Sequence, residues 1–275
     1  MKKAFLAVLG LHLFFAAVYA GEVPSRIVSL APNLTEILFA MGLGDRVVGV
    51  TSFCDYPEEA KRRQKVGGMS NPSIEAVVSL KPDLVVVTTD GNPMEFEGRL
   101  RSLKIKTYVF RSRRLQELPQ GVRGMGAALG VKERGDALAE MMEHTIRRLG
   151  IKNPPERKRR LLFIVWPEPL IVAGTGTVID DAITLLGGEN IAAGGKGTYP
   201  KYSVEEILHN SPDVILIGKG QGHEDMEKVS KRLLDRLKNV SAVRNGKVFF
   251  VSDLLYRLGP RTCRGIEEMA GYIGK

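Results

Sequence analysis

Residues 73–87 read Ser-Ile-Glu-Ala-Val-Val-Ser-Leu-Lys-Pro-Asp-Leu-Val-Val-Val, and residues 203–217 repeat the pattern as Ser-Val-Glu-Glu-Ile-Leu-His-Asn-Ser-Pro-Asp-Val-Ile-Leu-Ile. Both copies contain a serine, a β-branched residue and a glutamate, then further apolar positions, Pro-Asp and four aliphatic residues. The two copies align without a gap. Agreement over this length in one register indicates that the protein contains two related halves.

Each copy predicts a short helix followed by a buried strand. Ser73 and Ser203 are suitable N-cap residues, because the hydroxyl can accept a hydrogen bond from a first-turn N–H, and Ser203 with Glu206 fits a capping box. Apolar residues at helical spacing form one face, and Pro82 and Pro212 end the helices. The aliphatic residues that follow are typical of parallel strands that are buried on both faces.

The rest of the chain alternates strand and helix patterns in both halves. Strands are expected at residues 26–30, 47–50, 84–87, 107–110, 161–165, 170–173, 214–217 and 248–251. The segment 170–186 is expected to repeat the first strand and helix of the chain. This alternation predicts two doubly wound α/β lobes. Because ligands bind beyond the carboxyl ends of strands in such sheets, we expect a ligand cleft between the lobes.

Val131 to Leu149 predicts one long helix that connects the halves. It contains no proline, and its apolar residues recur at helical spacing over roughly 28 Å. The alternative is an ordinary last helix of the first half. We therefore divide the chain into a signal peptide (1–20), an N-terminal α/β lobe (21–130), a connecting helix (131–152) and a C-terminal α/β lobe (153–275).

The first 20 residues have the features of a secretory signal. Lys2 and Lys3 precede an apolar stretch from Ala4 to Ala17, and Val18-Tyr-Ala20 fits a cleavage site. The alternative is an uncleaved anchor. No cysteine lies near the cleavage site, so no lipid anchor is expected. We expect export to the periplasm, with the mature chain starting near Gly21.

The formal charge of +9 includes the two lysines of that segment, so the mature chain carries 9 − 2 = +7 on this count. A basic balance suits an anionic ligand, an anionic surface or nucleic acid. Because export is expected, no nucleic-acid partner is expected. The basic runs at 111–114 and 156–160 are either functional or part of a solvated surface.

Two cysteines remain, Cys54 and Cys263, one in each half. In an oxidising compartment they can form a disulfide if their Cα atoms approach closely enough. Two free, partly buried thiols are the alternative.

Signatures of enzymes are absent or weak. His144, His209 and His223 do not have metal-ligand spacing. His223-Glu-Asp225 either contacts a cation or forms a polar loop. Gly174-Thr-Gly-Thr177 lacks the third glycine of a dinucleotide fingerprint, and no phosphate-binding loop or nucleophile elbow occurs. We expect no catalytic residues, no resident metal and no cofactor.

Aromatic, polar and basic residues instead follow several expected strands, and two tyrosines, Tyr199 and Tyr202, precede the second copy of the repeated pattern. They are Phe53, Asp55, Tyr56, Thr88, Thr89, Asp90, Asn92, Trp166, Tyr199, Tyr202, Asp253, Tyr256, Arg257 and Arg261. Aromatic side chains at strand ends suit a flat ligand of mixed polarity, although each one can also pack at the rim of its lobe.

The chain also resembles a known family over nearly its whole mature length. The motifs that carry the resemblance are Val28-Ser-Leu-Ala-Pro-Asn-Leu-Thr-Glu36, Val48-Gly-Val50, Asp55-Tyr-Pro57, Leu80-Lys-Pro-Asp-Leu84, Gly187-Gly-Glu-Asn190, Ser211-Pro-Asp213 and Gly259-Pro-Arg261. They resemble the helical-backbone periplasmic binding proteins of ABC importers, most of all the cobalamin-binding members. The resemblance implies two lobes joined by one long helix and no catalysis. It also implies a monomer that passes a large metal-chelate ligand to a permease in the inner membrane.

The resemblance further implies roles for individual residues. The corrinoid would contact Phe53, Met69, Thr88, Trp166 and Tyr199, with Asp253 and Arg257 as polar residues of the cleft. Met69 and Thr88 stand where the cobalamin-binding members have tryptophans. Glu75 and Glu205 correspond to the acids that dock onto permease arginines, and each also stabilises the start of its helix.

Two other functions are carried as alternatives. The same fold can bind haem or a ferric siderophore, and Arg111, Arg113, Arg257 and Arg261 would suit an anionic siderophore. A metal-dependent enzyme that uses His223 and Asp225 is the second alternative.

Overall fold

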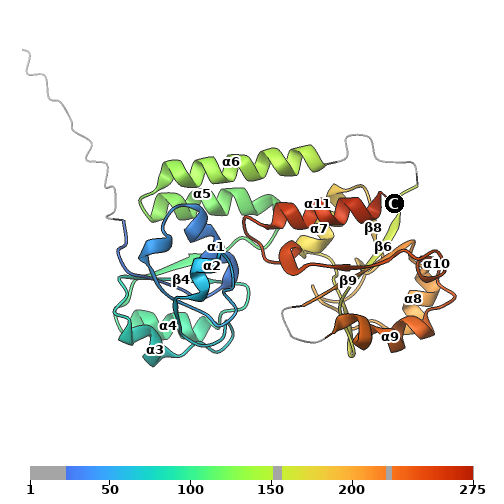
Figure 1. Ribbon diagram of the computed structural model, residues 1–275, viewed down its shortest axis with the longest axis horizontal. Coiled ribbons are helices and arrows are strands. Elements are labelled where there is room, and N and C mark those ends of the chain that lie inside the picture. Colours follow the sequence, from blue (N-terminus) through green and yellow to red (C-terminus); the bar gives the residue numbers. More distant parts are fainter. Residues whose placement is uncertain (1–22, 151–156, 221–224, 275) are drawn as a thin grey trace, which may run out of the picture.

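The computed structural model describes residues 23–150, 157–220 and 225–274. Two α/β lobes lie side by side, and helices α5 (Leu118–Ala128), α6 (Lys132–Leu149) and α11 (Thr262–Ile273) run along one side of the pair (Figure 1). The predicted signal peptide (1–20) and His223 lie outside the described residues. Within them, no helix combines the length and apolar character needed to cross a bilayer.

The N-terminal lobe contains a five-stranded, fully parallel sheet. Its order is β3 (Gln64–Lys65), β2 (Val47–Val50), β1 (Ile27–Ser29), β4 (Leu84–Thr88) and β5 (Thr107–Phe110). The helices are α1 (Pro32–Ala40), α2 (Glu58–Lys61), α3 (Ile74–Ser79) and α4 (Met94–Ser102), with 3-10 turns η1 (Gly44–Arg46) and η2 (Leu115–Glu117). The predicted doubly wound lobe is confirmed for this half.

The C-terminal lobe contains a mixed sheet. Its order is β10 (Val248–Val251), β9 (Val214–Gly218), β6 (Arg160–Pro167) and β7 (Leu170–Val172), and β8 (Glu189–Asn190) pairs with the start of β6. The helices are α7 (Val178–Leu185), α8 (Val204–Asn210), α9 (Met226–Arg236) and α10 (Ser241–Arg244), with the 3-10 turn η3 (Asp253–Leu255).

One sequence prediction for this lobe is wrong. The segment 170–186 does not repeat the first strand and helix of the chain, because β7 pairs antiparallel with β6. A two-residue connection allows only a hairpin, whereas parallel neighbours need a long crossover. The counterpart of β1 in this lobe is β6. It pairs in parallel with β8 and β9, just as β1 pairs in parallel with β2 and β4.

The repeated pattern forms the predicted helices and strands. The Ser73 hydroxyl accepts a hydrogen bond from the Ala76 N–H at 3.1 Å and begins α3. Ser203 begins α8 in the same way, and the Glu206 carboxylate accepts the Ser203 N–H at 2.7 Å, which completes the predicted capping box. Strands β4 and β9 are buried along their whole length.

The structure also explains why Pro-Asp recurs in both copies. The Asp83 carboxylate accepts the N–H of Arg26 at 3.1 Å, just before β1. In the other lobe the Asp213 carboxylate accepts the N–H of Arg160 at 2.9 Å, at the start of β6. Asp83 therefore holds the start of β1 against β4, the strand that follows Asp83. Asp213 holds the start of β6 against β9 in the same way.

One hydrophobic core extends through both lobes. Successive side chains of β4 and β9 point to opposite faces of their sheets. Val86 and Leu216 belong to the core that both lobes share, whereas Val85 and Ile215 belong to separate cores within their own lobes. The shared core also contains residues of α1, α5, α6, α7 and α11. The lobes are therefore joined by packed apolar side chains as well as by the chain connection.

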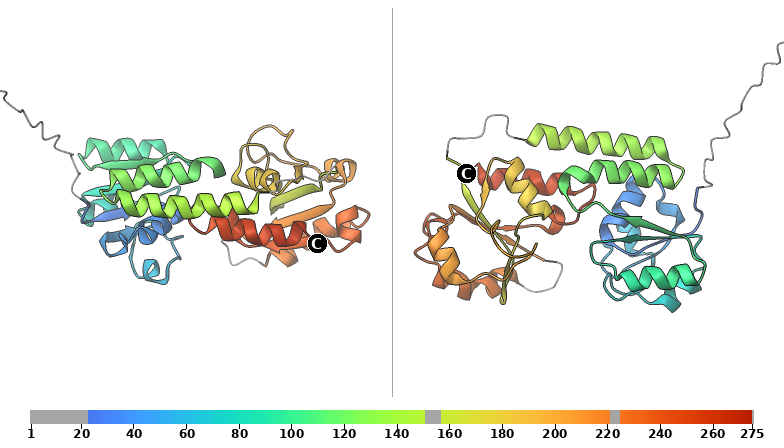
Figure 2. Two further views of the ribbon diagram at one scale, coloured as in Figure 1. Left: turned by 90° about the horizontal axis from the view of Figure 1, so that it is seen from above. Right: turned by 180° about the vertical axis from the view of Figure 1, so that it is seen from behind.

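Helix α6 connects the lobes, as the sequence predicts. It folds back on α5, and its far end lies beside α11, where Arg148 forms an ion pair with Glu267 (Figure 2). At the start of α6 the backbone of Gly135 touches that of Gly126 in α5, since a Cβ at Gly135 would lie 2.8 Å from the Gly126 Cα. The two helices approach this closely because neither residue has a side chain.

We predict that Gly135→Ala lowers the free energy of unfolding by about 1–3 kcal/mol, because the added methyl group separates α5 from α6. The matched control is Gly98→Ala in α4, where a Cβ meets nothing within 4 Å. That change should instead stabilise the protein by about 0.5–1 kcal/mol through higher helix propensity. Urea denaturation measures both values, and equal effects of the two changes would contradict the close-contact interpretation.

Candidate functional site

A cavity of about 330 Å³ lies between the lobes and is lined by residues of both. The lining residues are Pro32, Asn33, Phe53, Met69, Ser70, Asp90, Tyr256, Arg257 and Leu258. Phe53 follows β2, Asp90 follows β4 and Tyr256 follows β10, so these side chains come from loops beyond the carboxyl ends of the strands. This is the position that doubly wound sheets use for ligands.

A larger hollow of about 1180 Å³ lies elsewhere, at the opposite end of the N-terminal sheet. Its lining comes from one lobe, and three of its basic residues, Arg101, Lys104 and Lys106, are exposed. The interlobe cavity is smaller, but it combines aromatic side chains and polar groups from both lobes. We therefore regard the interlobe cavity as the candidate site.

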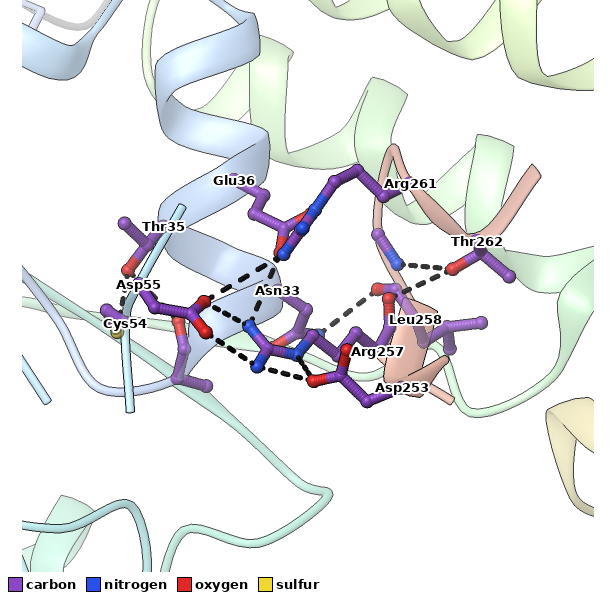
Figure 3. A network of polar contacts seen from close by, with 12 residues as sticks. Asn33, Thr35, Glu36, Cys54, Asp55, Asp253, Arg257, Leu258, Arg261 and Thr262 are labelled. Carbon is purple, nitrogen blue, oxygen red and sulfur yellow. Dashed lines mark hydrogen bonds and ion pairs between the residues drawn. The ribbon is translucent and has the colours of Figure 1, made fainter. Parts of the chain in front are cut away.

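The floor of this cleft is an ionic cluster formed by the side chains of Glu36, Asp55, Asp253, Arg257 and Arg261 (Figure 3). The Arg257 guanidinium donates to Asp253 at 2.6 Å through Nε and to Asp55 at 2.6 Å through Nη1. Arg261 donates to Glu36 at 2.5 Å. Glu36 and Asp55 belong to the N-terminal lobe and the arginines to the C-terminal lobe, so the cluster joins the lobes.

The acids of the cluster differ in their environments. Burial raises the pKa of Glu36, and the hydrogen bond and charge of Arg261 offset this only in part. Burial also acts to raise the pKa of Asp55, but the hydrogen bond and charge of Arg257 outweigh it, so that the pKa of Asp55 is lowered. Asp55 therefore remains ionised, and half of its side chain is exposed.

Aromatic side chains surround the cluster. The Tyr56 ring lies 4.0 Å from the Arg261 guanidinium, which is a cation–π contact. The Tyr256 hydroxyl accepts the Gly220 N–H at 3.1 Å, and its ring meets Phe163 edge-on. Burial, followed by the charge of Asp253, raises the pKa of Tyr256 to about 12.

Only some of the predicted ligand-binding residues line the cavity. Phe53, Met69 and Arg257 line the cavity, and Asp253 lies behind Arg257 and holds it. Tyr199 is 47% exposed and is not among the residues that line the cavity, and burial followed by the charge of Asp90 raises its pKa to about 12.

Thr88 and Trp166 are not among the residues that line the cavity. Thr88 is buried at the end of β4, where its hydroxyl accepts the Asp90 N–H at 3.2 Å and its own N–H donates to Asn92. The Trp166 indole N–H donates to the Glu168 carbonyl at 2.7 Å, and its ring packs against the core of the C-terminal lobe.

Glu36 and Asn33 belong to the site although the sequence analysis did not select them. Asn33 donates from its amide to the Leu258 carbonyl at 3.2 Å, across the lobes. Glu36 is the one charged residue in α1, which is otherwise apolar or neutral. A lone acid on a buried helix is a signal that could have identified it, because a buried charge requires a partner.

Cys54, Cys263 and Asp225 all lie within the described residues. Cys54 and Cys263 are both buried free thiols, so the alternative of two free thiols holds here. In the described part of the chain no group of three His, Cys, Asp or Glu side chains could hold a metal ion. Asp225 caps the start of α9 through the Glu227 and Lys228 N–H groups.

The two proposed docking acids are exposed on equivalent helices. Glu75 lies in the first turn of α3 and Glu205 in the first turn of α8. Both helices lie on the side of the molecule opposite α6 (Figure 1). The Ser73 hydroxyl donates to Glu75 at 3.0 Å, and hydrogen bonds with the backbone and with Ser73 lower the pKa of Glu75.

We predict that Arg257→Met lowers the free energy of unfolding of the ligand-free protein by about 3–5 kcal/mol, because it leaves partly buried carboxylates without their cation. The control is Arg101→Met, which breaks an ion pair with Glu97 on the surface and should cost less than about 1 kcal/mol. Denaturation by urea gives both values. If both variants lost the same free energy of unfolding, the interlobe ionic cluster would stabilise the protein no more than the surface ion pair of Arg101 and Glu97 does.

Comparison with known proteins identifies the family. The sequence pattern described as periplasmic binding protein matches residues 27–254. A vitamin B12-binding protein of Vibrio cholerae is 30% identical over 252 residues, with 90% of this chain and 88% of the relative covered. The crystal structure of the periplasmic vitamin B12 binding protein BtuF of Vibrio cholerae superposes with a TM-score of 0.80 at 29% identity, covering 92% of this chain and 97% of that one.

Two further relatives differ in the function that their names state. The uncharacterized ABC transporter substrate-binding lipoprotein YvrC of Bacillus subtilis (strain 168) is 32% identical over 258 residues, covering 91% of this chain and 80% of the relative. The periplasmic heme-binding protein RhuT from Roseiflexus sp. RS-1 has a TM-score of 0.79 at 31% identity, with 90% and 97% covered. These matches in sequence and in structure show that the chain belongs to the periplasmic binding protein family.

Proposed function

We propose that this protein binds a corrinoid such as cobalamin between its lobes in the periplasm and delivers it to the permease of an ABC importer. The signal peptide would direct export and be removed near Ala20, and the mature protein would act as a monomer without catalysing a reaction. The observation that carries the proposal is the cavity between the lobes, lined by Phe53, Met69 and Tyr256 beside charged groups. Relatives in sequence and in structure are named as vitamin B12-binding proteins.

The cleft suits an amphipathic macrocycle. Phe53 is 47% exposed and offers a ring face, while Met69 adds a flexible apolar side chain. A corrinoid is larger than the 330 Å³ cavity, so only part of the ligand would be enclosed there. The rest would contact the walls formed by loops such as the one that carries Tyr199.

The charges of the cleft floor argue against an anionic siderophore. Arg257 and Arg261 would suit such a ligand only if they were unpaired. In the structure these two guanidiniums contact three carboxylates, Glu36, Asp55 and Asp253. An anionic chelate would have to displace these acids, whereas a neutral corrinoid would not.

Haem is the second candidate cargo, and the similarity to RhuT favours it. Haem iron is commonly held by His, Cys, Met or Tyr. The cavity lining includes Met69 and Tyr256, and no histidine occurs among its described residues. Ligation by tyrosine uses the tyrosinate, and in the ligand-free protein burial raises the pKa of both Tyr199 and Tyr256 to about 12, so the iron itself would have to promote loss of the proton.

We predict that the purified mature protein binds cyanocobalamin more tightly than haemin or a ferric catecholate, as measured by absorption titration. Phe53→Ala should weaken cyanocobalamin binding about 2- to 10-fold, because it removes an aromatic contact worth roughly 0.5–1.5 kcal/mol. Leu103→Ala serves as the control, since Leu103 is similarly exposed but lies at the end of α4. Preferential binding of haemin would replace the corrinoid with haem as the cargo.

The docking surface that we propose consists of the exposed faces of α3 and α8. One turn after Glu75, Val78 is 41% exposed, and one turn after Glu205, Leu208 is 44% exposed. Each lobe therefore presents an acid beside an aliphatic side chain in the same arrangement. A permease with two equivalent sites, each with an arginine beside an apolar surface, would fit both lobes at once.

We predict that Glu75→Lys together with Glu205→Lys leaves ligand affinity unchanged and abolishes transport in vesicles that contain the importer. The matched control is Glu133→Lys together with Glu140→Lys, two exposed acids of α6 on the opposite side, which changes the net charge equally. Transport by the first variant at the wild-type rate would contradict the docking assignment, and equal loss in both variants would indicate a general effect of charge.

A further inference from the structure

The cavity lining contains two charged side chains, Arg257 and Asp90, and they differ in how much of their hydrogen-bonding capacity is already used. Besides its bonds through Nε and Nη1, Arg257 donates through Nη2 to Asp55 at 3.1 Å, and Nη2 lies 2.5 Å from Asp253. Its side chain is 5% exposed. Arg257 therefore directs its N–H groups to protein carboxylates rather than to a ligand.

The partners of Arg257 add acceptors at the floor of the cleft. The Asp55 side chain is 54% exposed although it accepts two hydrogen bonds from Arg257. A carboxylate has about four lone-pair positions, so Asp55 keeps capacity for further donors. Asp55 therefore adds exposed acceptor oxygens to the ionic cluster, whereas the N–H groups of Arg257 are directed to protein carboxylates.

Asp90 supplies a second acceptor from the N-terminal lobe. It is exposed, and its backbone N–H donates to Thr88. Within the described residues its carboxylate has no ion pair and no hydrogen bond. The nearby Arg113 is directed to Thr89, whose carbonyl accepts from it at 2.7 Å and whose hydroxyl accepts at 3.2 Å.

A corrinoid carries primary carboxamides around its ring, and their N–H groups donate to carboxylates in charge-assisted hydrogen bonds. A corrinoid that carries a carboxylate at the same place has no donor to offer and brings a like charge to Asp90. Asp90 is exposed to water in the free protein, so a ligand that covers it without donating a hydrogen bond leaves its carboxylate desolvated and unpaired, which lowers the affinity for that ligand. Resting on the proposed function, we propose that this cleft selects fully amidated corrinoids over those with peripheral carboxylates, and that Asp90 is a specificity-determining residue.

The experiment compares cyanocobalamin with its three separated monocarboxylic acids, each made by hydrolysing one peripheral propionamide. Equilibrium dialysis at pH 7 measures binding to the wild-type protein, to Asp90→Asn and to Asp90→Lys. At least one of the three monocarboxylic acids should bind the wild-type protein at least ten times more weakly than cyanocobalamin does. In the Asp90→Asn variant this difference in affinity should fall below about threefold. The Asp90→Lys variant should bind the same monocarboxylic acid at least as tightly as it binds cyanocobalamin.

Asp45→Asn is the control, because Asp45 is an exposed acid in η1 that does not line the cleft, and it should keep the wild-type penalty. Equal binding of cyanocobalamin and all three acids by the wild-type protein would overturn the inference and leave the proposed function intact. A penalty that persists in Asp90→Asn and Asp90→Lys would overturn the role of Asp90. Failure of the wild-type protein to bind cyanocobalamin would overturn the proposed function itself, and this inference with it.

Discussion

The buried guanidinium of Arg257 holds the cleft together, because it binds Asp55 from one lobe and Asp253 from the other. A cation this far from solvent needs charged partners, and here they come from loops that follow β2 and β10. The same contact fixes the loop that presents Phe53 on one side and Tyr256 on the other. The geometry of the candidate site therefore depends on the pairing of one arginine.

The shared core limits how the lobes can move about this ionic floor. Apolar residues of α1, α5, α6, α7 and α11 form one continuous cluster, and Arg114 binds Asp181 of α7 across the lobes. Packed interiors resist continuous deformation. We therefore expect small rotations of the lobes around the cleft and not a wide hinge opening, in keeping with a connection made by helix α6 instead of flexible strands.

The repeated pattern made the fold predictable. It contains its own cap, its own helix stop and its own buried strand, so the helix–strand unit of each copy was fixed by local chemistry. The hairpin of β6 and β7 was not predicted, because an aliphatic run such as Leu170–Val172 has the same appearance in parallel and antiparallel strands. Only the pairing partner, here β6, decides the direction.

The sequence by itself determined the two related lobes, the long helix between them and the exposed acid at the start of each repeated helix, and it selected candidate residues for the cleft. The tertiary structure alone decided which of these residues line the cavity and that both cysteines stay free. It also decided that Arg257 is neutralised by an acid 202 positions away. The reason is physical: caps and strand periodicity act between near neighbours in the chain, whereas the pairing and burial of charges depend on distances that exist only after the lobes have packed together.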